Sequence, residues 1–101
     1  MATQESLQSK LEEILGSRNV YYQPPESLKI NYPAIIYNRE KIDISRANNK
    51  TYIKNNRYAL VYIDKTPDSP VIDRLLELPY CSHDRQYKSE NMIHDALTLY
   101  W

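Results

Sequence analysis

The stretch RYALVYIDK, residues 57–65, and its continuation TPDSPVIDRLLELP, residues 66–79, decide the fold. Residues 57–65 are β-prone and apolar on both faces, which predicts a central strand. Residues 66–70 then supply a capping hydroxyl, a proline for the first helical position and an early acid, so a helix begins there. Pro79 ends this helix. Its apolar side consists of Val71, Ile72, Leu75 and Leu76.

Upstream of this unit, the pattern predicts one helix and two strands. Residues 4–15 carry an amphipathic stripe, with Thr3 as the N-cap. Gly16, the only glycine, occupies the position after the helix that requires a left-handed backbone. Residues 19–23 form a short strand or extended arm, and residues 31–40 form a strand. The stripe itself consists of Leu7, Leu11, Ile14 and Leu15.

Between the strands lies KIDISRANNKTYIKNNR, residues 41–57, which is polar and rich in asparagine. Asn48 and Asn49 are a turn signal that lacks its usual glycine. We therefore predict a long hairpin whose tip projects from the body. A polar tip has little reason to pack on its own core, so we expect residues 46–56 to reach another subunit. The candidate interface residues here are Arg46, Asn48, Asn49, Tyr52 and Asn55, although spacing alone does not distinguish the asparagines from ordinary turn residues.

The octapeptide YCSHDRQY, residues 80–87, places side chains of hydrolase chemistry next to one another. A nucleophile also needs an oriented base and an oxyanion hole, and no glycine follows residue 16 to expose backbone N–H groups. No pair of ligands has the spacing of a metal site. We expect no enzyme activity, no cofactor and no metal, with Cys81 as a small buried side chain. The segment is predicted to bridge the second helix to a last strand at residues 91–101.

Length and composition place the chain among single globular domains. It has 101 residues, of which 42% are hydrophobic and 26% charged, so residues 1–101 are expected to form one domain. No apolar run approaches a membrane span, and the start has no secretory pattern. With a single cysteine and no export signal, a reducing cytoplasm is the default compartment.

Charge is balanced over the whole chain and over its halves. Residues 1–50 carry seven Lys and Arg against six Asp and Glu, and the remainder carries six against seven. We find no cluster of Lys and Arg, so we expect neither tight DNA or RNA binding nor sequence-specific nucleic-acid binding.

The predicted elements run in the order helix, short strand, strand, long hairpin, strand, helix and strand. This order favours an α+β domain. We expect a single, mostly antiparallel sheet with two helices packed on one face and a projecting hairpin.

The stretch LPYCSHDRQYKSENMIHDALTLY, residues 78–100, resembles the C-terminal end of small siphophage and prophage tail-terminator (tail-completion) proteins. The shared features are a Leu-Pro, a Cys, an Asp-Arg-x-Tyr, an acid-Asn pair, a His and a strand closed by an aromatic residue. RANNKTY at 46–52, RYALVYI at 57–63 and the helix start at 66–79 fit the same pattern. The resemblance covers roughly residues 30–100.

This resemblance implies a structural virion protein that assembles as a homohexameric ring. Such a ring caps the tail tube protein, ends tail polymerisation and presents a surface to the head–tail connector protein. It belongs to the tail or neck of the virion, is assembled in the host cytoplasm, and lets genome DNA pass without a membrane partner. In this picture Asp84, Arg85 and Tyr87 orient the last strand or contact a neighbouring subunit.

Two alternatives stay open. One is a head–tail connector or neck protein that sits nearer the capsid. The other, from a different class, is a small cytoplasmic binding module or small enzyme. A native mass near that of six copies favours the ring, and a monomer favours the second class.

Overall fold

The computed structural model describes residues 3–47 and 51–101, with the backbone alone at residues 43–47 and 51–55. The turn predicted at Asn48 and Asn49 lies outside the described residues. In chain order the elements are α1 (Gln4–Leu15), β1 (Val20–Tyr22), β2 (Ala34–Ala47), β3 (Thr51–Asp64), α2 (Pro70–Leu76), β4 (Cys81–Ser89) and β5 (Met92–Tyr100).

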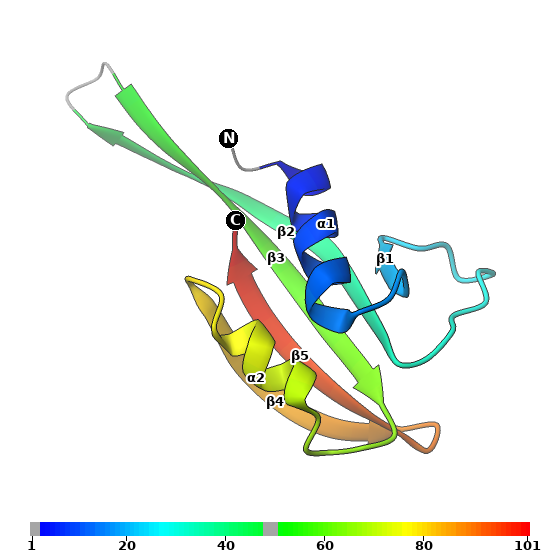
Figure 1. The fold of residues 1–101 in the computed structure, drawn as a ribbon. Helices are drawn as coiled ribbons and strands as arrows, with labels where there is room; N and C mark the ends of the chain where they lie inside the picture. The colour runs from blue at the N-terminus through cyan, green and yellow to red at the C-terminus, as the bar shows by residue number, and fades with distance from the viewer. Residues whose placement is uncertain (1–2, 48–50) are drawn as a thin grey trace.

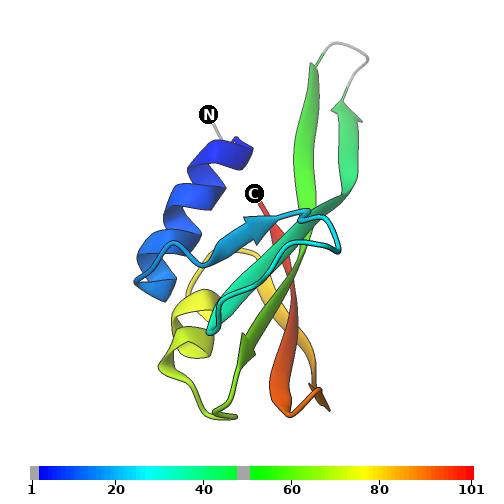
Figure 2. The ribbon, with the colours of Figure 1, turned by 90° about the vertical axis from the view of Figure 1, so that its right-hand side faces the viewer.

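The strands form one sheet in the order β1-β2-β3-β5-β4. β1 is parallel to β2, and the other three neighbouring pairs are antiparallel. Both helices lie on the same face of the sheet (Figure 1, Figure 2). The predicted α+β class is therefore confirmed, and so is the central place of the strand at residues 57–65. Of the helices in the described residues, none combines the length and apolar character that crossing a membrane requires.

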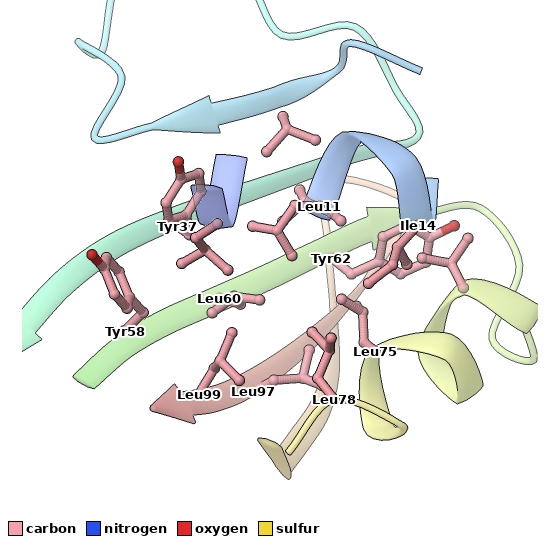
Figure 3. Close-up of a cluster of buried hydrophobic side chains, with 14 residues drawn as sticks. Leu11, Ile14, Tyr37, Tyr58, Leu60, Tyr62, Leu75, Leu78, Leu97 and Leu99 are labelled. Carbon is pink, nitrogen blue, oxygen red and sulfur yellow. The ribbon is translucent and has the colours of Figure 1, made fainter. Parts of the chain in front are cut away.

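The core lies between the sheet and the two helices (Figure 3). Alternate strand positions face this layer because successive side chains of a strand point to opposite faces. In β3 these positions are Tyr58, Leu60 and Tyr62, each at most 1% exposed. The other members of the core are Leu7, Leu11, Ile14, Val20, Ile35, Tyr37, Val71, Leu75, Leu78, Leu97 and Leu99.

The helix ends follow the sequence signals closely. The Thr3 side chain accepts a hydrogen bond from the Ser6 backbone N–H at 3.1 Å, and the Ser6 hydroxyl accepts from the Thr3 N–H at 3.0 Å. Gly16 has φ of 79°, the left-handed conformation that the sequence predicts. α2 begins with Ser69 as its N-cap, followed by Pro70.

The segment predicted as a bridge into the last strand is itself a strand, β4, at one edge of the sheet. The prediction was wrong because residues 82–90 are all exposed, so no apolar alternation marks a strand. β4 pairs with β5 from end to end, and Glu90 and Asn91 form the two-residue connection. Both connecting residues have positive φ, 52° and 64°, as a tight hairpin requires.

β2 and β3 continue beyond the rest of the sheet as a two-stranded ribbon (Figure 1). β5 pairs with β3 only as far as Arg57, which lies opposite Tyr100. Beyond the pair formed by Lys41 and Arg57, neither strand has a third strand beside it among the described residues. We call residues 41–57 the arm. Six further pairs at about 3.4 Å each make it extend about 20 Å past the body.

The arm gives the molecule a large surface. The chain measures 51 × 27 × 23 Å and exposes 6983 Å². A compact monomer of its 12.0 kDa exposes about 6000 Å². At the base of the arm, the backbone N–H of Trp101 donates to the Asn56 carbonyl at 2.9 Å, and its indole N–H donates to the Ser6 hydroxyl at 2.9 Å. The body therefore holds the base of the arm through Asn56 and Trp101.

Candidate functional site

The cysteine of the octapeptide has the environment of a core residue. Cys81 begins β4 and packs its half-buried side chain against the hydrophobic core. Burial first, and the negative charge of Asp84 second, raise the pKa of the Cys81 thiol from 9.0 to about 11. The thiolate is the nucleophile and the metal ligand, so a thiol with a raised pKa is not activated for either role.

The histidine of the octapeptide belongs to a polar cluster around the buried Asp95. His83 Nε2 lies 3.0 Å from Asp95 Oδ1, and the Asp95 side chain is only 3% exposed. Gln86 donates to the same carboxylate oxygen at 3.0 Å and to the Pro67 carbonyl at 3.1 Å. The cluster joins β4, β5 and the segment before α2, so it positions the edge strand. Sequence reasoning missed it, although an acid at position 95 interrupts an apolar alternation that continues at 97 and 99.

The outer face of β4 and β5 carries the candidates near the octapeptide. Asp95 faces the helices, so His94 and Thr98 point to the opposite face of the sheet. There Thr98 donates to the Asp84 carboxylate at 2.6 Å. The Tyr87 ring stacks on His94 with centroids 4.9 Å apart, and the Arg85 guanidinium lies 4.9 Å from the Tyr87 centroid.

The structure therefore brings Asp84, Arg85 and Tyr87 together on one exposed face, which we call the β4 patch. Each of the three already has a partner within the chain, so the patch is ordered before any neighbour arrives.

The other candidates lie on the arm. Arg46 pairs with Tyr52 across the two strands, and Asn55 pairs with Asp43. The side chains of these residues are outside the described part of the structure, as are Asn48 and Asn49 altogether.

The two groups of candidates lie at opposite ends of the sheet. Tyr87 pairs with His94, and His94 with Ile63, whereas the arm starts at the pair of Arg57 and Tyr100. The arm and the β4 patch can therefore touch each other only if they belong to two different copies of the chain.

The arm also carries a charge cluster that the comparison of the two halves did not reveal. Within residues 41–57 one acid, Asp43, stands against five bases, so the net charge is +4. The bases are Lys41, Arg46, Lys50, Lys54 and Arg57. The earlier comparison of residues 1–50 with residues 51–101 divides the arm between the two halves. Each half then combines part of the positive charge of the arm with the charges of the body. The expectation that no Lys and Arg cluster exists is therefore corrected: Lys41, Arg46, Lys54 and Arg57 lie on the paired strands β2 and β3, and Lys50 lies outside the described residues.

A groove of about 470 Å³ separates the two helices. Its charged walls are balanced, with Lys10 and Arg74 against Glu13 and Glu77, and its apolar surface comes from Ile14, Leu78 and Pro79. Tyr80, the next residue, is 81% exposed and has φ of 59°. A bulky residue rarely adopts this left-handed conformation. Among the described residues, no three His, Cys, Asp or Glu side chains converge as metal ligands.

No family model matches this chain, and no curated protein is detectably similar to it in sequence. The resemblance to tail terminators, over roughly residues 30–100, rests on the sequence motifs alone.

Proposed function

We propose that this protein is a structural virion component that forms a ring, expected to be a hexamer, at the end of a phage tail tube. The ring ends tail polymerisation and provides the surface for joining the tail to the head. The observation that carries the proposal is the arm, a two-stranded ribbon that extends about 20 Å from the body. The motifs at residues 46–52 and 78–100 give the proposal its tail-terminator form.

An arm of this kind is suited to contacts between subunits. An isolated two-stranded ribbon is marginally stable in water, so a partner that covers it adds stability. The chain exposes 6983 Å², about 1000 Å² more than a compact monomer of its mass. In this proposal the arm contacts a different patch on the neighbouring copy, which makes the contact heterologous. Contacts of this type generate closed rings when the rotation between copies closes.

The octapeptide supports a structural rather than a catalytic role. The Cys81 thiol has a raised pKa, and His83 is engaged by a buried carboxylate of the sheet. These side chains stabilise β4, which presents the β4 patch. In this proposal the protein acts as a structural ring and not as a catalyst. It is assembled in the host cytoplasm and resides in the virion.

The second candidate is a connector or neck protein one ring nearer the capsid. The arm supports this candidate equally well. It favours a ring of subunits, but it does not identify the ring that lies next to it. A small cytoplasmic binding module is the third candidate, and it predicts a chain that stays monomeric with every tail component.

The test measures tail-tube length. Tail-tube subunits are polymerised with increasing amounts of this protein, and the tubes are examined by electron microscopy. We expect shorter tubes, each with a ring at one end. A variant in which residues 43–55 are replaced by Asn-Gly is the matched control, and it should leave the tubes long. Unaltered tube growth at saturating wild-type protein, with no ring at the ends, contradicts the terminator proposal and moves the neck protein ahead.

A further inference from the structure

The groove between the two helices carries equal numbers of acids and bases. α1 contributes Lys10 and Glu13, and α2 with its C-cap contributes Arg74 and Glu77. Each wall therefore offers one acid and one base. A groove of this composition has no net charge to attract a strongly basic or strongly acidic partner, but its walls are complementary to those of a second copy of the same groove.

An exposed aromatic side chain stands directly beside this groove. Leu78 and Pro79 line the groove, and Tyr80 follows them in the chain with 81% of its surface exposed. The Tyr80 ring therefore does not fill the groove of its own chain, and it lies outside the hydrophobic core. Aromatic side chains bury about 150–250 Å² each when they are covered, and tyrosine is a frequent anchor of protein interfaces.

The backbone at Tyr80 is strained. Its φ of 59° is a left-handed conformation, which glycine adopts readily and a bulky residue rarely adopts. The turn itself joins α2 to β4, and the Tyr100 N–H donates to the Tyr80 carbonyl at 3.3 Å. The fold thus uses the backbone of Tyr80 and not its ring. A bulky side chain at a strained position, with no place in the core, points to a contact outside the chain.

We propose that two copies of the chain associate about a twofold axis at this surface, with Tyr80 of each copy seated in the groove of the other. A ring that projects beside a groove is self-complementary under such an axis. The operation that places one ring in the partner's groove also places the partner's ring in the first groove. Ile14, Leu78 and Pro79 form the apolar surface that receives the ring. The inference goes beyond the proposed ring, and it does not use the arm.

The charges around the groove support a symmetric contact. When α1 of one copy lies against α2 of the other, the wall with Lys10 and Glu13 faces the wall with Arg74 and Glu77, and symmetry repeats this arrangement. Opposite charges can then pair in both halves of the contact. The ion pair between Lys10 and Glu13, at 3.8 Å, is exposed, so it contributes little to the single chain and is readily exchanged for a pair across the contact.

The size of the contact indicates a weak dimer. Two tyrosine side chains that are covered by the partner bury roughly 400 Å² together. Stable complexes bury about 800 Å² on each partner, and weak, transient complexes bury less. We therefore expect monomers at micromolar concentrations and dimers as the concentration approaches millimolar. The same contact gains importance wherever copies are held close together.

The first test removes the ring and keeps the turn. Tyr80→Gly suits the left-handed backbone, so its melting temperature should equal or exceed that of wild type. Sedimentation equilibrium from micromolar to millimolar concentration should show the dimer weakened at least about tenfold. Leu28→Ser is the control, because Leu28 is 43% exposed and does not line the groove, and it should dimerise like wild type.

The second test reverses the charges of the groove. Lys10→Glu with Arg74→Glu makes the groove acidic, and Glu13→Lys with Glu77→Lys makes it basic. Each variant alone meets like charges in its own dimer, so at about 0.1 M salt it should stay monomeric where wild type is half dimeric. An equal mixture restores opposite charges across the contact and should form the mixed dimer. This rescue is specific to a groove that meets a second groove.

Matched controls carry the same changes of charge at exposed positions outside the groove. They are Lys29→Glu with Lys88→Glu, and Glu26→Lys with Glu90→Lys. The controls should dimerise like wild type. Circular dichroism and thermal unfolding check that every variant is folded.

If the acidic variant is unfolded because Arg74 no longer donates to the Ile14 carbonyl, Lys10→Glu alone takes its place in the mixture. Wild type that stays monomeric at millimolar concentration, reversed variants that dimerise like wild type, or a mixture without rescue overturns the proposal. A loss in Tyr80→Gly without rescue in the mixture makes another surface the partner of Tyr80 and also overturns it. None of these variants changes the arm, so the result is independent of the tube assay.

Discussion

At the scale of residues, Asp95 shows how one buried charge is accommodated. It is 2% exposed, yet it lies at a core-facing position of β5 between Ile93 and Leu97. Two donors, from His83 and Gln86, meet a single oxygen of its carboxylate. A buried charge without partners is costly, so the carboxylate fixes the position of β4 through the two side chains that must reach it.

Removing this carboxylate should cost more stability than removing an exposed one. Asp95→Ala leaves His83 and Gln86 without their shared acceptor, and we expect a loss of about 3 kcal/mol in the free energy of unfolding. Asp84→Ala is the control, because its carboxylate is exposed and accepts one hydrogen bond from Thr98. That change should cost at most about 1 kcal/mol. Urea unfolding measures both, and equal losses would show that the cluster contributes nothing beyond a surface bond.

Cys81 predicts how stability depends on alkaline pH. Its pKa is raised from 9.0 to about 11 in the folded chain, so both states are protonated below pH 9. Between these values the unfolded chain loses the proton first, and stability falls as pH rises. Cys81→Ala should lower stability at pH 7 through lost packing and should reduce the loss between pH 9 and pH 11. Unfolding curves at both pH values check this, and an unchanged alkaline slope in the variant contradicts it.

At the scale of elements, the sequence was informative where one physical signal dominated. Thr3 and Gly16 bound α1 as expected because capping and left-handed geometry depend on local chemistry. β4 was missed because its side chains meet solvent, so the strand is held by backbone pairing and by Asp95, a partner on another strand. The arm was predicted as a hairpin. Its net charge of +4 was recognised only after the strand pairing had given its bounds, residues 41–57.

The arm should be separable from the folded body. Beyond Lys41 and Arg57 its two strands have no third strand beside them among the described residues, and the core positions of β3 begin at Tyr58. The bond from Trp101 to the Asn56 carbonyl is kept when residues 43–55 are replaced. Replacing residues 43–55 with Asn-Gly keeps the hairpin direction and joins the strands by a favoured two-residue turn. We expect a monomer whose melting temperature lies within about 5 °C of wild type, because little buried surface is lost. Thermal unfolding checks this, and failure to fold would show that the arm stabilises the core.

At the scale of the whole molecule, the arm and the β4 patch give the subunit two different candidate contact surfaces. The helices cover one face of the sheet, the β4 patch lies on the opposite face, and the arm continues β2 and β3 beyond the other strands (Figure 1). In the proposed ring the arm contacts a neighbouring copy, which leaves the charge-balanced β4 patch for a different neighbour. A ring component needs such a third surface, because it contacts its own copies and also the ring above or below it.

Hydrogen exchange should reveal which surfaces become covered in the ring. Strand residues 57–64 of β3 have neighbours on both sides, whereas 51–56 pair with β2 alone. Amides that lack a second neighbouring strand open more readily, so peptides over residues 51–56 should exchange faster in the free chain than those over 58–64.

On assembly, peptides from the arm should slow by about tenfold or more, because in the proposed ring a neighbouring copy covers them. The loop at residues 24–31 serves as the internal control and should not change. Mass spectrometry of exchanged rings and free chains measures both regions together. Rings in which the arm exchanges as fast as in the free chain would remove it from the contact between copies. Slowing confined to residues 81–89 would instead make the β4 patch the surface that closes the ring.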